Sequence, residues 1–498
     1  MLIFKMKKMK KLYIKISMII ISITAFTACS DDFVNVDSND VTSEDFFNSE
    51  EDYQNALIGA YDLLQSTWIN AMLGEIASDN TLAGGESATD VIGIQEIDDM
   101  IHTPVNNDLR GIWGLMFAGI NRTNFILEFQ DKIDFSGKNQ IIAQARFLRA
   151  YYYFELVKWF GDVPLAIDKQ ILFGEESSYE RSPASEVYSL IEQDLMFASD
   201  NLPSVQTEAG RVTKGAAQAL LGKAYLYQDK FSEAAQVLEA LIQSGTYSLV
   251  TDYNTIFEED GENNVESVFE IQYTDVEGAG FGCLQCSEGN VAVGFSGIRN
   301  YEGPDFTSGF SFNVPVQEAY DAFDNDDQRR DIAILDINAW AASTGATFGT
   351  GNEHTGYFNR KYIPRTRSSN ALPDLNLTNP NNYRAIRYAD VLLMAAEANS
   401  RGGLNESKAQ DYLNQVRRRA FGDELHDVNA SGLSLTNAIY LERRLELVGE
   451  GHRFFDLVRT GKAAQEINGF QEGKHELFPI PAIEIQLAGN VWAQNPGY

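Results

Sequence analysis

The chain has 498 residues, of which 44% are hydrophobic and 22% charged, and its 71 acidic residues outnumber 39 basic ones to give a net charge of −32. A charge of this size repels nucleic acids and anionic lipid surfaces, so neither is an expected partner of the folded chain. The length is enough for two or more domains, or for one large helical array.

The first 28 residues have the layout of a secretion signal, because six lysines and no acidic residue accompany the apolar run 16–28. This run would span only about 20 Å as a helix, less than the roughly 30 Å hydrocarbon core of a membrane. We therefore predict a signal peptide over residues 1–28. Without it, 33 basic residues face 71 acidic ones, a net charge of −38. Cys29 follows directly, and residues 29–48 are predicted to form an acidic tether.

Residues 49–253 are predicted to form a helical region. Its first helix should start near Ser49, because Ser49 and Asp52 have the spacing of a capping box and an apolar stripe follows them. A loop-rich stretch over 78–108 separates this helix from helical patterns in "LRGIWGLMFAGINRTNFILEF" and "NQIIAQARFLRAYYYFELVKWFG". We expect Trp113 and Trp159 in these patterns, and Trp492 near the end of the chain, to lie in the core.

Three segments have the pattern of tetratricopeptide helix pairs. The clearest is 216–245, where small Gly222 and Ala234 would let two antiparallel helices approach closely. A second pair is predicted over 387–420, on either side of a Gly-Gly turn, and a looser third pair joins 145–161 to 182–203. The predicted fold is therefore mainly α, a tetratricopeptide-like helical array.

Residues 254–498 are predicted to form a second region, in which a loop-rich insertion over 254–382 is followed by closing helices. The insertion is rich in Gly, Asn and Asp and contains short strand-like runs such as "ESVFEIQY". Its aromatic residues follow no helical period and could form either a local core or an exposed binding platform. They are Phe281, Phe295, Tyr301, Phe306, Phe310, Phe312, Trp340, Phe348 and Tyr357.

Motifs that would hold a metal or a cofactor are weak. Cys283 and Cys286 form a lone C-x-x-C pair, which fits a local disulfide or two free thiols better than a zinc site, since zinc prefers four ligands. The acidic run "DNDDQRRD" (324–331) lacks the glycine and the spacing of a calcium loop and is predicted to be a solvated turn. The sequence also lacks a nucleophile elbow, a phosphate loop and an H-E-x-x-H motif, so we predict no metal and no cofactor.

One cluster of carboxylates could belong to an enzyme. Glu442, Glu446 and Glu450 follow one another by four residues in "LERRLELVGEGHRFFDLVRTG", and a glycosidase uses two such acids. Arg443 and Arg444 lie between them, however, so the pattern favours a salt-bridged scaffold helix that Gly461 would cap. We predict no catalytic residue and no enzymatic activity.

Several segments resemble one family, the SusD/RagB outer-membrane lipoproteins of Bacteroidetes-type bacteria. The resemblance spans the chain from residue 29 onward, and the segments that carry it are "SEEDYQNALIGAYDLL", "WGLMFAGINRTN", "AQARFLRAYYYFELVKWFGDVPL", "YRAIRYADVLLMAAEA", "LERRLELVGEGHRFFDLVRTG" and "LFPIPAIEIQLAGNVWAQNPGY". It implies a cell-surface binding lipoprotein that captures oligosaccharides and delivers them to a TonB-dependent SusC-like transporter, without catalysis. A peptide-binding or protein-interaction tetratricopeptide scaffold is the alternative, and a glycosidase is a third possibility.

The resemblance also implies positions for the anchor and the ligand. Cys29 matches the family's lipidated cysteine, which would hold the protein at the outer membrane with its body facing the cell exterior. Family ligand residues come from loops that correspond here to about 79–107 and 281–357. A pyranose needs flat rings for its C–H faces and polar groups for its hydroxyls. We therefore expect Trp340 and Tyr301 to stack on the sugar, and the hydroxyl partners to be Asp79, Asn80, Asn300 and Arg299.

Overall fold

The structure, a computed structural model, describes residues 46–278, 280–365 and 373–498. The chain divides into two compact units, 1–52 and 53–498. In the described part of the first unit, the backbone N–H of Ser49 donates to Asp52 Oδ2 at 2.8 Å, and that of Asp52 donates to Ser49 Oγ at 3.3 Å. This confirms the predicted capping box at the start of α3, which runs over Glu50–Asp62. The predicted signal peptide, Cys29 and most of the tether lie outside the described residues.

Helices make up most of the described chain from residue 46 to residue 243. After α3 they are η2 (Leu63–Thr67), α4 (Trp68–Ile76), α5 (Ile92–Asp98), α6 (Asn107–Glu128), α7 (Lys138–Phe160), η3 (Glu176–Ser178), α8 (Ala184–Asn201), α9 (Lys214–Leu226) and α10 (Phe231–Gln243). Closing helices occupy the end of the chain: α15 (Tyr388–Arg401), α16 (Glu406–Phe421), α17 (Gly432–Leu447), α18 (Arg453–Arg459), α19 (Ala463–Glu466) and α20 (Ala482–Leu487). Trp113, Trp159 and Trp492 are buried among them, as predicted.

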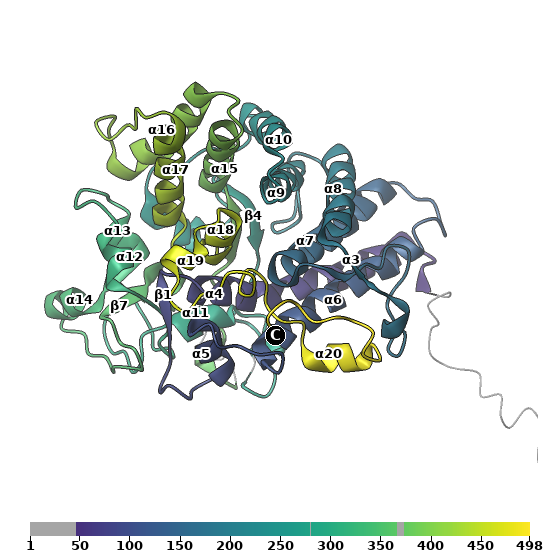
Figure 1. The fold of residues 1–498 in the computed structure, drawn as a ribbon, viewed down its shortest axis with the longest axis horizontal. Coiled ribbons are helices and arrows are strands. Elements are labelled where there is room, and N and C mark those ends of the chain that lie inside the picture. Colours follow the sequence, from purple (N-terminus) through teal and green to yellow (C-terminus); the bar gives the residue numbers. More distant parts are fainter. Residues whose placement is uncertain (1–45, 279, 366–372) are drawn as a thin grey trace, which may run out of the picture. The chain divides into compact units, whose positions relative to one another are not determined.

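The three predicted helix pairs are present as α7 with α8, α9 with α10, and α15 with α16, and successive pairs pack against one another (Figure 1). Gly222 of α9 shows why the central pair is so close. A Cβ atom at this position would lie 2.5 Å from Cδ2 of Leu238 on α10, so a larger residue would force the Leu238 side chain to shift. The mainly α, tetratricopeptide-like array is therefore confirmed, and α10 packs on α15 to join helices from the two predicted regions.

The insertion is rich in loops, with short strands and short helices, as predicted. Its helices are η4 (Tyr253–Phe257), η5 (Glu259–Gly261), η6 (Leu284–Cys286), α11 (Val291–Ser296), α12 (Gln317–Asp321), α13 (Arg330–Ala333), α14 (Ile337–Thr344), η7 (Arg360–Tyr362) and η8 (Leu375–Leu377). Across the described residues the strands pair antiparallel in twos, and four of the strands lie within residues 254–382. They are β1 (Thr81–Gly84) with β5 (Phe312–Pro315), β2 (Val163–Pro164) with β3 (Arg181–Ser182), β4 (Ser267–Ile271) with β8 (Tyr383–Arg387), and β6 (Ile334–Asp336) with β7 (Tyr357–Asn359).

The prediction of a single scaffold helix over 441–461 is wrong in one respect, because this segment belongs to two helices. α17 ends at Leu447 and α18 begins at Arg453. Gly449 and Gly451 between them have φ values of +80° and +81°, in the left-handed region that glycine adopts at little cost. A side chain on Gly451 would also collide with the backbone of Ala71. Gly461, with φ +67°, follows the end of α18.

A buried network of ion pairs fills the space between the insertion and the closing helices. Glu442, Glu446 and Glu450 all take part, which confirms that they belong to the scaffold. The network also includes Asp327, Arg329, Lys361, Glu266, Arg387, Arg417 and Arg419. The prediction of a solvated turn over 324–331 is therefore wrong in part, since Asp327 and Arg329 are buried in this network.

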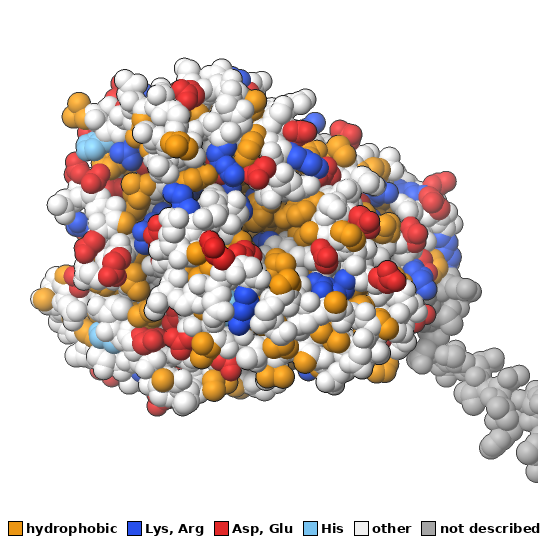
Figure 2. Space-filling model, in the orientation of Figure 1, with side chains coloured by type: hydrophobic (Ala, Val, Ile, Leu, Met, Phe, Trp, Pro, Cys, Tyr) orange, Lys and Arg blue, Asp and Glu red, His pale blue; other side chains and the backbone are white. Residues whose placement is uncertain are grey.

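Charges of both signs are interspersed over the surface seen in Figure 2. None of the helices in the described part of the chain is both long enough and apolar enough to cross a membrane.

Candidate functional site

The β1–β5 pair brings the loop after β1 against loops of the insertion. Together residues 84–91, 297–311 and 340–354 form a surface that we call the loop face, near β1, β7 and α14 in Figure 1. Backbone hydrogen bonds hold it together: Gly85 N–H donates to Ser311 O at 2.8 Å, Asn352 N–H to Gly85 O at 2.8 Å, and Gly349 N–H to Arg299 O at 2.7 Å. Because the loops are tied to one another, their backbone is ordered before any ligand arrives.

Trp340 and Tyr301 meet on this face, but only Trp340 keeps part of its surface open. The Trp340 indole N–H donates to Tyr301 Oη at 2.9 Å, and Tyr301 O–H donates to Pro304 O at 2.7 Å. Trp340 is half-buried, with its ring 5.2 Å from that of Phe306. Tyr301 is only 6% exposed and is packed in the hydrophobic cluster beneath. In this structure Tyr301 therefore supports Trp340 and offers no open ring face.

Arg299 and Asn300 also lie on the loop face, in different roles. The Arg299 guanidinium donates through Nη2 to Phe310 O at 2.8 Å and through Nε to Ser311 Oγ at 3.1 Å, with Glu86 3.9 Å away. It thus fixes the loop that carries Phe310. Asn300 is exposed, and its φ of +49° is a left-handed conformation that Asn tolerates better than most residues. Its amide is available as a donor and acceptor for a ligand.

Asp79 and Asn80 lie at the opposite end of β1 and belong to an internal polar cluster. Asp79 pairs with Arg453 at 2.7 Å and with Arg444 at 3.1 Å. Asn80 is fully buried; its Nδ2 donates to Glu75 Oε1 at 3.0 Å and its Oδ1 accepts from Arg444 Nε at 2.9 Å. The structure therefore brings four of the six predicted ligand residues together and leaves these two with partners inside the protein.

Two further aromatic residues of the insertion lie on the loop face, although the sequence did not identify them as ligand residues. Phe310 and Phe348 are half-buried, and the Phe348 ring lies 5.7 Å from that of His354. Their place in the chain could not distinguish them from Phe295 and Phe312, which are buried. Exposed ring area beside Asn300 and the carboxylate of Glu86 is a combination that suits the C–H faces and hydroxyls of a sugar.

A half-buried carboxyl group lies beside β1. Asp98 Oδ2 accepts from the backbone N–H of Ala83 at 2.6 Å. The pKa of Asp98 is raised to about 7, mainly by burial and to a smaller extent by the charge of Glu353, while the hydrogen bond from Ala83 acts in the opposite direction. The strand that leads into the loop face is therefore coupled to a group that titrates near neutral pH.

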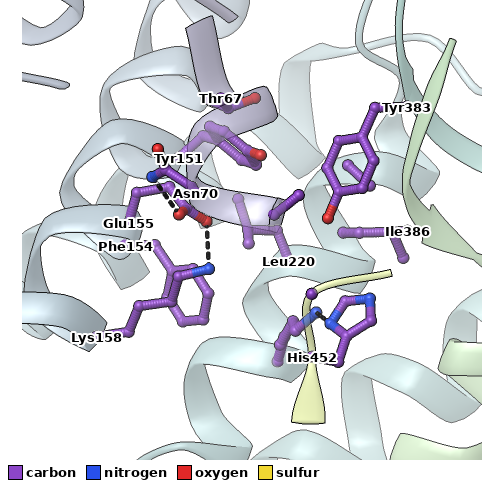
Figure 3. Close-up of a pocket in the computed structure, with 14 residues that line it drawn as sticks. Thr67, Asn70, Tyr151, Phe154, Glu155, Lys158, Leu220, Tyr383, Ile386 and His452 are labelled. Carbon is purple, nitrogen blue, oxygen red and sulfur yellow. Dashed lines mark hydrogen bonds and ion pairs between the residues drawn. The ribbon is translucent and has the colours of Figure 1, made fainter. Parts of the chain in front are cut away.

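The polar cavity in Figure 3 is a different kind of site. Glu155 of α7 accepts from Asn70 Nδ2 at 2.7 Å and pairs with Lys158 at 2.6 Å, while Lys223 lies 3.2 Å from His452 Nδ1. Its volume is about 20 Å³, which is room for about one water molecule and too little for a sugar ring. No cluster of residues suited to hold a metal ion occurs in the described ranges.

Larger hollows lie beside β4. Two neighbouring grooves have volumes of about 340 Å³ each and share Ala209, Gly210, Arg211 and Glu270 in their linings. Both have room for a ligand. Among the described residues, those that line the grooves do not include the six predicted ligand residues.

Two family models match the chain. Residues 265–476 match the model described as "SusD family", and residues 32–226 match one described as "Starch-binding associating with outer membrane". The chain is also 29% identical to SusD-like protein P2 of Formosa agariphila, over 97% of this chain and 99% of that protein.

Solved structures of similar proteins match this fold over nearly all of their own length. A laminarin-binding SusD-like protein matches with 36% identity and a TM-score of 0.82, over 91% of this chain and all of that one. Surface glycan-binding protein A from Bacteroides thetaiotaomicron, in complex with laminarihexaose, matches with 29% identity and a TM-score of 0.78, over 90% and 99% of the two chains. The chain therefore belongs to the SusD/RagB family.

Proposed function

We propose that this protein is a cell-surface glycan-binding protein that captures oligosaccharides on the loop face, with laminarin as the first ligand to test. The observation that carries the proposal is the match to a structure described as a laminarin-binding SusD-like protein, over 91% of this chain and all of that one. In this proposal residues 49–253 supply the helical region and residues 254–498 the region with the ligand-binding loops.

The chemistry of the loop face supports this function. The open part of Trp340 would stack on a sugar ring, Tyr301 would hold the indole in place, and the Asn300 amide would bond hydroxyls. Arg299 would act mainly by ordering the loop at Phe310. Asp79 and Asn80 would contribute only to the structure, by binding Arg444 at the opposite end of β1.

Binding without catalysis is part of the proposal. The carboxylates of the one acidic cluster that could resemble a glycosidase pair, Glu442, Glu446 and Glu450, are at most 1% exposed. Each already accepts from guanidinium or ammonium groups, such as Arg329, Arg387 and Lys361. A saccharide cannot reach them in this fold.

Attachment and delivery complete the proposal. A lipid on Cys29 would hold the acidic body at the outer membrane, facing the exterior, and a TonB-dependent SusC-like transporter would receive the glycan. A single acyl chain binds membranes only reversibly, so we expect more than one. Replacing Cys29 with Ala should release folded protein from the membrane fraction; retention of the variant at the cell surface would contradict the anchor.

Calorimetry with the mature chain, residues 29–498, tests the binding. We expect laminarihexaose to bind, and Trp340→Ala to weaken binding by roughly tenfold, the effect of losing about 1.4 kcal/mol of ring contact. Phe173→Ala is the matched control, because Phe173 is 89% exposed in the connection between β2 and β3. Equal losses in both variants would refute the loop face as the site. Binding of peptides but of no carbohydrate would favour the peptide-binding scaffold.

A further inference from the structure

The segment that leads to the two insertion cysteines leaves the core and returns to it at fixed points. At its start Tyr273 N–H donates to Asn382 Oδ1 at 2.8 Å, and at its end Asn290 N–H donates to Asn379 O at 2.7 Å. Thr274 N–H closes the base by donating to Glu288 O at 2.8 Å. Residues 280–287 lie at the far side of this base, and we call them the disulfide loop.

The disulfide loop carries an aromatic ring to the edge of the loop face. Phe281 is 61% exposed, and its ring lies edge-on to that of Phe310 at 5.4 Å. Phe310 is itself fixed, since its carbonyl accepts from Arg299 and its ring packs against buried Phe295 at 5.9 Å. Phe281 therefore extends the exposed aromatic surface beyond Phe310. Single exposed aromatic rings are common on protein surfaces, whereas an exposed ring that adjoins other aromatic rings indicates a binding site.

The residues next to Phe281 do little to hold it. It lies between Gly280 and Gly282, and glycine has the greatest conformational freedom of all residues. Space around Gly282 is open, so packing does not require a glycine there. Two residues further on, Cys283 and Cys286 form a disulfide, which settles the question left open by their spacing. Cys283 N–H also donates to Gly280 O at 3.0 Å, so the cross-linked turn is bonded to the residue that precedes Phe281.

We propose that Phe281 is a further ligand-contact residue of the loop face, and that the Cys283–Cys286 disulfide is its positioning element. The proposal rests on the proposed function, because it assigns a stacking role toward the same sugar. A cross-link lowers the number of conformations that the loop can adopt when the ligand is absent, so less freedom is lost on binding. The sugar would then extend from Trp340 toward Phe281.

A cycle of variants tests this proposal by calorimetry with laminarihexaose. Phe281→Ala and the double variant Cys283→Ser/Cys286→Ser should each weaken binding by about 2- to 10-fold, the range expected for one aromatic contact. The triple variant should bind no more weakly than Phe281→Ala alone, because the disulfide acts through that ring. Phe173→Ala again serves as the control and should bind like the wild type.

Proteolysis supplies a readout that needs no ligand. Chymotrypsin should cut after Phe281 faster in the double serine variant than in the wild type, at unchanged urea midpoint. Equal cutting rates would refute the positioning role. Unchanged affinity in Phe281→Ala would refute the contact role. Additive losses of affinity in the triple variant would refute the coupling of this ring to the disulfide. If the wild type binds no glycan, the proposed function fails and the contact role with it, while proteolysis still decides the positioning role.

Discussion

Replacing Glu446 with Gln tests the buried ion-pair network most sharply. The Glu446 carboxylate is fully buried and accepts from Arg387 at 2.8 Å, Arg419 at 2.6 Å and Arg329 at 2.8 Å. Two of these donors share Oε1 and the third bonds Oε2. An amide can accept at only one of these positions, and its NH₂ group would point at a guanidinium N–H at the other.

The expected loss follows from the charge that remains. Glu446→Gln leaves a buried positive charge without its partner, and breaking a buried ion pair costs about 3–5 kcal/mol. The free energy of unfolding, measured by urea denaturation, should fall by about that amount. Glu424→Gln is the matched control, because the Glu424 side chain is 76% exposed and 3.7 Å from Arg418; we expect a change below about 1 kcal/mol.

The pH dependence of the effect gives a second check. The three guanidinium groups hold the pKa of Glu446 well below its ordinary value of 4.5, against burial, which acts in the opposite direction. A carboxylate with a lowered pKa stabilises the fold above its unfolded pKa and loses this contribution as the pH falls toward the folded value. The difference between wild type and Glu446→Gln should therefore shrink below about pH 4.5. A Glu446→Gln variant within about 1 kcal/mol of the wild type at pH 7 would refute this account of the network.

Two further substitutions probe the array and the strand beneath the loop face. Gly222→Ala should lower the free energy of unfolding by about 1–3 kcal/mol because its Cβ would collide with Leu238. Gly114→Ala in α6, where space is open, is the control and should be neutral or stabilising. Equal effects of the two substitutions on the free energy of unfolding would contradict the close packing at Gly222. Asp98→Asn should gain stability over the wild type as the pH rises from about 4 to about 7, because burial raises the pKa of Asp98 to about 7 and the ionised form is disfavoured in the fold. A difference in urea midpoint that does not vary between pH 4 and pH 8 would refute it.

Local patterns predicted the helical part of this fold well. The capping box at Ser49 is a signal between neighbours in sequence, and Ser49 has its expected partner, Asp52. The small residue at 222 is a signal between consecutive helices, and Gly222 lies close to the next helix as expected, where it meets Leu238. The same applies to the strand over Ser267–Ile271 and to the buried tryptophans. Such features depend on spacing, which a single sequence displays directly.

The candidate site was predicted less completely, because it depends on contacts distant in sequence. Asn80 and Tyr301 carry groups that suit a sugar, yet Asn80 is satisfied by Arg444, 364 residues away, and Tyr301 is covered by the cluster around it. Asp327 looked solvated because it lies in a charged run, but it pairs with buried Arg329. Spacing alone gives no information on which polar residue of a loop points inward.

A crystal structure of the mature chain with laminarihexaose would show whether the loop face binds the oligosaccharide. We expect the oligosaccharide on the loop face, with one sugar ring on Trp340 and a hydroxyl within hydrogen-bond distance of the Asn300 amide. An oligosaccharide bound in the grooves beside β4, or a loop face left empty at saturating ligand, would contradict the account.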